Sequence, residues 1–217
     1  MSDFEEKWKK SQIVGWKKDK EEAVLFFKRF GIELGDLYNQ ILDLEYEKMR
    51  TACFLLSKMR MITMVCDFLD QQAKKKYWDV DVMKLYFLIS HAEIAMKTFG
   101  GNGYKNGLVR KYFEPVVDKY KLNYKIKLSF GGFPKNKERN LSATDILYKI
   151  RCEYVHEGNY TGKFFKDENA EKHVYNIFIF KRDNLEILCG ECSLTYKSFI
   201  NIYMEALAEN IKSFLKN

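Results

Sequence analysis

Two polar residues, Arg151 and His156, stand out in a stretch from Ser142 to Gly158 that the sequence predicts to be one bounded helix. Arginine is a permanent cation that matches anionic groups, and histidine gains or loses a proton near neutral pH. Five residues of ideal helix separate the two side chains by about 140° of rotation and about 7.5 Å of rise. They therefore do not share one face of a regular helix.

Two arrangements could bring Arg151 and His156 together in one cationic cleft. The last turn before Gly158 could loosen, or a twofold dimer could set two copies of the helix against each other. The alternative is structural: an arginine at the flank of the helix in a salt bridge, and a histidine whose charge complements the C-terminal end of the helix dipole. Spacing alone leaves all three open.

Local signals define the limits of this helix and the face that it buries. Ser142 and Asp145 form a start that resembles a capping box, because each side chain can accept an unpaired backbone N–H of the first turn, and Gly158 can close the other end. Apolar residues at helical spacing predict a buried face formed by Ile146, Leu147, Ile150 and Tyr154. Arg151 lies at the edge of that face, so it needs an anionic partner.

The segment Y-K-I-R-C-E-Y-V-H-E-G resembles the R-x-x-x-x-H motif of HEPN-domain proteins, many of which are metal-independent endoribonucleases. The resemblance implies catalytic roles for Arg151 and His156 and for no other position. It also implies a helical bundle that dimerises to build its active cleft and that needs no cofactor or metal. The partners that it implies are RNA, a second copy of the chain and a protein inhibitor. A toxin or defence context is one of several that the family covers. Cys152 stands where the motif often has Asn or Asp. The predicted helices on either side of the motif extend the resemblance to roughly residues 80 to 217.

Two further functions remain open beside RNA cleavage by attack of the 2′-hydroxyl. One is a HEPN-like protein that binds nucleic acid or a nucleotide without catalysis, which the departure at Cys152 favours. The other is a helical protein-interaction module. The net charge of +7 and the pI of about 9.0 favour an anionic partner but do not separate cutting from binding.

The composition bounds the class of protein. A chain of 217 residues with 47% hydrophobic and 31% charged residues and two prolines is typical of a folded, mainly helical protein. The N-terminus lacks the pattern of a signal peptide, and no apolar run approaches the roughly 18 residues that span a membrane. We therefore expect a cytoplasmic protein.

The five cysteines are expected to be thiols in a reducing compartment. Cys189 and Cys192 have the C-x-x-C spacing of metal and redox sites, but no second such pair exists, and the histidines are scattered. A structural metal or redox role is the less favoured interpretation of this pair. No cluster of metal-ligating residues accompanies the Arg151–His156 motif either.

The overall expectation is a mainly α protein: a helical bundle with a small β-hairpin insertion and an N-terminal helical extension. The extension covers residues 1–77, with a helix over 18–32 and a helical run over 34–76 that forms one long helix or two, and the bundle covers 78–217. Helices are predicted over 82–99, 108–124, 142–157 and 194–215, the last capped by Ser193, with a loop at 130–136 and the hairpin near 174–190. In the 82–99 helix, His91 and Glu93 are either cleft residues or satisfied core residues. Three lysines with Tyr77 and Trp78 form either an RNA-contacting patch or a solvated helix end.

Overall fold

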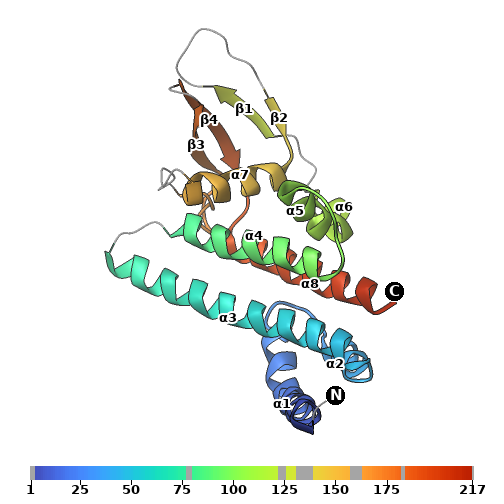
Figure 1. Ribbon diagram of the computed structural model, residues 1–217. Coiled ribbons are helices and arrows are strands. Elements are labelled where there is room, and N and C mark those ends of the chain that lie inside the picture. The colour runs from blue at the N-terminus through green and yellow to red at the C-terminus, as the bar shows by residue number, and fades with distance from the viewer. Residues whose placement is uncertain are drawn as a thin grey trace.

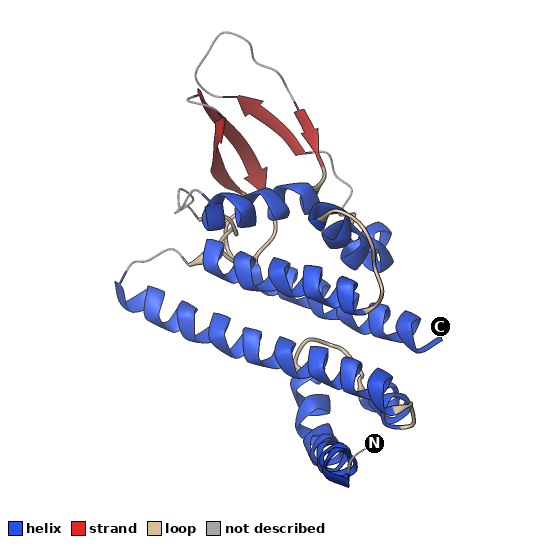
Figure 2. Ribbon diagram, in the orientation of Figure 1, coloured by secondary structure: helices blue, strands red, loops and turns tan. Residues whose placement is uncertain are grey.

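The computed structural model describes residues 3–76, 80–121, 126–130, 139–156, 163–181 and 184–216. The fold is mainly α, and a small antiparallel sheet stands beside α7 (Ala143–His156), on the side away from α4 (Asp81–Thr98) (Figures 1 and 2). This confirms the predicted fold class, including the β-hairpin. Among the described residues no helix is long and apolar enough to cross a membrane.

Three helices make up the N-terminal region: α1 (Asp3–Lys28), α2 (Gly35–Leu42) and α3 (Tyr46–Lys76). Arg60 of α3 holds α1 in place, because its guanidinium donates to Asp19 at 2.6 and 2.7 Å and to Glu22 at 3.0 Å. The predicted limits of the first helix, 18–32, were wrong. It starts 15 residues earlier, at Asp3 rather than 18, and ends at Lys28, after which Gly31 takes a left-handed φ of 75°. The run over 34–76, for which the sequence left open one helix or two, forms two helices, because the chain turns between Leu42 and Tyr46.

The remaining helices are α4 (Asp81–Thr98), α5 (Lys105–Phe113), a 3₁₀ turn (Glu114–Val116), α6 (Val117–Tyr120), α7 (Ala143–His156) and α8 (Tyr196–Lys216). The predicted helix over 108–124 was wrong as a single element. Pro115 has no backbone N–H to continue the helical ladder, so the chain tightens into the 3₁₀ turn there. Lys121 then ends α6 in a left-handed conformation, with φ of 53°.

The last helix begins later than predicted. Thr195, not Ser193, caps α8, because its hydroxyl accepts the backbone N–H of Ser198 at 3.1 Å. Most of the α8 residues that face the other helices are fully buried, and Tyr203 at its centre has no exposed surface.

The sheet contains four antiparallel strands in the order β2-β1-β4-β3. Strands β3 (His173–Lys181) and β4 (Asn184–Cys192) form the predicted hairpin, in a register that pairs His173 with Cys192 and Lys181 with Asn184. Strands β1 (Ile126–Phe130) and β2 (Arg139–Leu141) were not predicted. Most of the predicted loop at 130–136 lies outside the described residues, as do Tyr77 and Trp78.

Buried residues of the N-terminal helices and of the later helices belong to one hydrophobic cluster. Lys84 joins the two regions by polar contacts as well: its ammonium group lies 2.8 Å from Asp70 of α3 and 3.0 Å from Asp81 of α4. Asp81 also accepts the backbone N–H groups of Phe164 and Phe165 at 2.8 and 2.7 Å. The predicted boundary at residue 77 stays a prediction.

Candidate active site

Helix α7 carries both predicted catalytic residues, and its start is set by Ser142 (Figure 1). The Ser142 hydroxyl accepts the backbone N–H of Asp145 at 3.2 Å, as a cap residue should. The Asp145 carboxylate has a different role from the predicted one. Both its oxygens accept N–H groups of Arg110 at 2.8 Å, which ties α7 to α5. Gly158, the predicted end, lies outside the described residues.

The predicted buried face of α7 is confirmed. Ile146, Leu147 and Ile150 are 0–3% exposed, and Tyr154 packs against the core from a half-buried position. This face lies on α4, so the flank of α7 that carries Arg151 is brought against the polar side chains of α4.

Arg151 has the anionic partner that the sequence called for, and that partner is Glu93 of α4. The Nη2 atom of Arg151 donates to Oε2 of Glu93 at 3.3 Å, and the two side chains are only 11% and 8% exposed. This is a buried ion pair, in which removal of one partner leaves an uncompensated charge. The structure thus shows the salt bridge that the structural alternative required, and it settles which element supplies the acid.

The ion pair is only partly formed. Nε of Arg151 and Oε1 of Glu93 are both shielded from solvent, and neither has a hydrogen-bond partner among the described residues. A well-formed arginine–carboxylate pair makes two short parallel hydrogen bonds of about 2.7–2.9 Å. Here one long contact forms, and Nε of Arg151 is left without an acceptor among the described residues, although it is closed off from solvent.

Aromatic side chains surround the guanidinium of Arg151. Its central carbon lies 5.9 Å from the centre of the Tyr86 ring, and the Tyr86 and Tyr154 rings lie 5.9 Å apart. Burial raises the pKa of the nearby Tyr148 phenol above its usual range, and its hydrogen bond with the Cys152 thiol and the negative charge of Glu93 act in the same direction. Cys152, the residue that departs from the motif, therefore faces Tyr148. Tyr148 stays a neutral phenol at physiological pH.

His156 is the last residue of α7, and its side chain lies outside the described part. The helix runs unbroken from Arg151 to His156, so the ideal-helix separation of about 140° holds within one chain. Residues 157 and 158 lie outside the described part of the chain, so the loosening of the last turn before Gly158 stays a prediction. The structure places Arg151 and His156 on one helix.

The other two histidines are a core residue, His91, and the first residue of β3, His173. His91 is 3% exposed; its Nδ1 lies 2.8 Å from the Tyr203 hydroxyl and its Nε2 3.3 Å from the carbonyl oxygen of Leu55. Burial lowers its pKa to about 4. It is therefore a satisfied core residue, whereas Glu93, paired with it in the sequence analysis, is the partner of Arg151. His173 Nε2 lies 2.6 Å from the carbonyl oxygen of Lys163.

No metal-ligating group of three or more His, Cys, Asp or Glu side chains occurs among the described residues. Cys189 and Cys192 both lie in β4, where residues three apart point to opposite faces. Burial raises the pKa of the Cys192 thiol to about 11, which disfavours the thiolate that binds metals.

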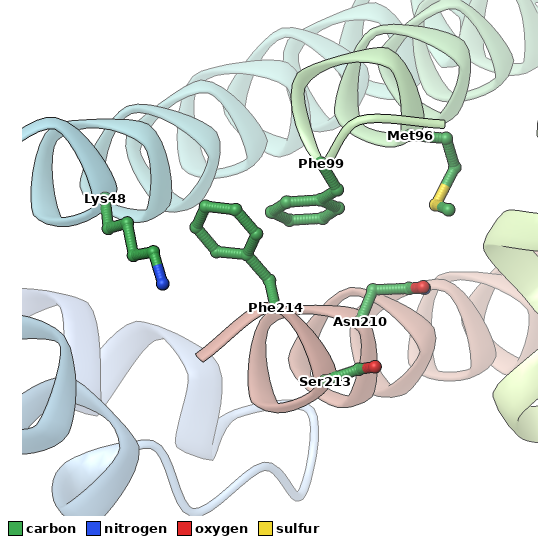
Figure 3. A pocket seen from close by; sticks show the side chains of 6 residues that line it. All are labelled: Lys48, Met96, Phe99, Asn210, Ser213 and Phe214. Carbon is green, nitrogen blue, oxygen red and sulfur yellow. The ribbon is translucent and has the colours of Figure 1, made fainter. Parts of the chain in front are cut away.

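A cavity of about 300 Å³ lies elsewhere, between the N-terminal part of α3 and the C-terminal ends of α4 and α8. The rings of Phe99 and Phe214 are tilted by 38° with their centres 5.0 Å apart. Figure 3 shows them with Lys48 on one side and Asn210 and Ser213 on the other. Met96 completes the lining. Arg151 does not take part in it.

The chain matches no family model, no curated protein and no solved structure.

Proposed function

We propose that the protein is a metal-independent endoribonuclease of the HEPN type, with Arg151 and His156 as its catalytic residues. The observation that carries the proposal is the buried guanidinium of Arg151, which Glu93 holds by one amino group while Nε has no acceptor among the described residues. Guanidinium groups with free donors suit phosphate oxygens, which accept hydrogen bonds at two positions. The net charge of +7 also favours a polyanionic substrate.

In this proposal the 2′-hydroxyl of RNA attacks the neighbouring phosphorus, the bond from phosphorus to the 5′-oxygen breaks, and a 2′,3′-cyclic phosphate and a 5′-hydroxyl result. Arg151 binds the phosphate and stabilises the charge that develops on its oxygens. His156 takes the proton of the attacking hydroxyl or gives one to the leaving oxygen. A second copy of the chain would supply the convergence of the two side chains that a single regular α7 lacks.

Incubation of the purified protein with mixed cellular RNA in the presence of EDTA tests the proposal. We expect discrete cleavage products that end in a cyclic phosphate, and a loss of about 10²–10⁴-fold in rate for His156→Ala. His173→Ala is the matched control, because it removes a histidine outside α7 and should leave the rate unchanged. Equal cleavage by the wild-type protein and His156→Ala would show that the activity belongs to another site or to a contaminant.

A second function, binding without catalysis, is favoured by a different observation. Glu93 already neutralises Arg151, and Cys152 replaces the polar residue that often follows the arginine of the motif. A HEPN-like nucleic-acid-binding protein of this kind would retain labelled RNA in a gel-shift experiment and leave it intact. Intact, bound RNA with every substrate offered would select this function over cleavage.

A further inference from the structure

Helix α3 exposes a stripe of apolar side chains, and this surface is independent of the Arg151 site. Its members are 38–68% exposed, although large apolar side chains are usually covered. The stripe consists of Phe54, Met61, Met64, Val65 and Phe68. At 100° per residue these positions fall within about 100° of one another on the helix, so they form one face about 21 Å long.

The apolar area of the α3 stripe is about the apolar share that each partner contributes to a dimer interface. Large apolar side chains offer about 200 Å² each, so the measured exposures leave roughly 500 Å² of apolar surface on the stripe. A standard interface buries about 800 Å² on each partner, and homodimer interfaces are about 65% apolar. The stripe supplies that apolar share, and the polar residues beside it supply the rim.

The spacing within the stripe is self-complementary. Phe54 and Phe68 each lie seven residues from Met61, one before it and one after it. If two α3 helices pair antiparallel about a twofold axis at Met61, each Phe54 meets the partner copy's Phe68, and the two Met61 side chains meet at the axis. Twofold interfaces require this property, because the same patch must fit itself.

We propose that the α3 stripe is the interface between two copies of this chain, which pair antiparallel about Met61. The interface lies apart from α7: α4 lies between α3 and α7 (Figure 1). A cleft between two α7 helices would therefore need a separate contact, and the α3 interface holds whether or not the protein cleaves RNA.

Sedimentation of Met61→Glu at micromolar concentration tests the interface. Two carboxylates at the axis should weaken the association by at least about 100-fold and halve the mass of the assembly. Ile94→Glu is the matched control, because Ile94 is 51% exposed on α4 while Met61 is 49% exposed. It should leave the mass unchanged, and circular dichroism should show both variants folded. A monomeric wild-type protein, or equal loss of association in both variants, overturns the proposal.

A charge exchange tests the antiparallel register. Phe54→Lys and Phe68→Glu should each weaken association, because a charge then faces an aromatic ring. The double variant should associate more tightly than either single variant, since each Lys at position 54 faces a Glu at position 68 of the other copy. In a parallel pair like charges would meet instead. A double variant that is no tighter than the weaker single variant refutes the antiparallel arrangement.

Discussion

Replacement of Arg151 by methionine should destabilise the folded protein by about 3 kcal/mol, apart from any effect on activity. Removal of one member of a buried ion pair costs about 3–5 kcal/mol, because the other charge is left buried without a partner. Glu93 is 8% exposed, so it cannot regain much solvation in place. We expect the lower end of the range, since the pair makes one contact of 3.3 Å and leaves two atoms unpaired in the wild-type protein.

The measurement is a double-mutant cycle in urea, with Arg151→Met, Glu93→Gln and the double variant. The unfolding midpoint and slope together give the free energy of unfolding. The double variant should lie within about 1 kcal/mol of the wild-type protein, because neither charge remains to be compensated. The two single changes should therefore be strongly non-additive.

The result bears on every activity assay at this site. An inactive Arg151→Met protein could be unfolded rather than catalytically impaired, whereas the double variant should be folded and lack only the guanidinium and the carboxylate. If Arg151→Met costs less than about 1 kcal/mol, or if the single effects add, the ion pair does not stabilise the fold and our account of Arg151 is wrong.

Three further predictions concern pH, metals and the substrate. Because burial lowers the folded-state pKa of His91 from 6.5 to about 4, the unfolded chain binds its proton first as the pH falls. The free energy of unfolding, measured by urea titration, should therefore drop by about 2 kcal/mol between pH 6.5 and 5. An equal drop in the His91→Leu variant would contradict this. Cleavage should continue in EDTA; loss that a divalent ion restores would call for a different catalytic centre. A single 2′-deoxynucleotide directly 5′ of a mapped cut should abolish cleavage there with little change in binding, and comparable cleavage would exclude attack by the 2′-hydroxyl.

Local signals in the sequence were sufficient for several elements. Helix α7 lies within one residue of its predicted limits, since a serine cap and an unbroken apolar face define it. Helix α4 and the β3–β4 hairpin also lie close to their predicted limits, because an apolar run marks the helix and alternating apolar residues mark the first strand.

Elements without such signals were less well defined. The turn between α2 and α3 contains neither glycine nor proline, so the apolar pattern left open one long helix or two. Strand β1 did carry a signal that was missed: Ile126, Leu128 and Phe130 alternate with Lys127 and Ser129. No element was predicted for residues 125–129, and the glycine-rich segment after them was predicted as the loop at 130–136.

The periodicity of the sequence could not identify the partner of Arg151. Glu93 precedes Arg151 by 58 residues, and only the packing of α7 on α4 brings the two side chains together. The sequence showed that a buried arginine needs an acid, but several acids were available. Tyr86, which contacts the guanidinium, was missed for the same reason.

The two interpretations of Arg151, structural ion pair and phosphate ligand, are compatible in this geometry. A purely structural pair would be expected to satisfy both partners, because each buried polar atom left without a hydrogen bond costs about 1–3 kcal/mol. Arg151 and Glu93 each leave one such atom. Glu93 can therefore orient the guanidinium through Nη2 while the remaining donors bind a phosphate.

In that case Glu93→Gln, which keeps an oxygen acceptor but removes the negative charge, should tighten RNA binding by the His156→Ala protein. Glu114→Gln, a change at an exposed residue of the 3₁₀ turn, should not. Weaker RNA binding by the Glu93→Gln protein would show that the charge of Glu93 is needed to present the arginine.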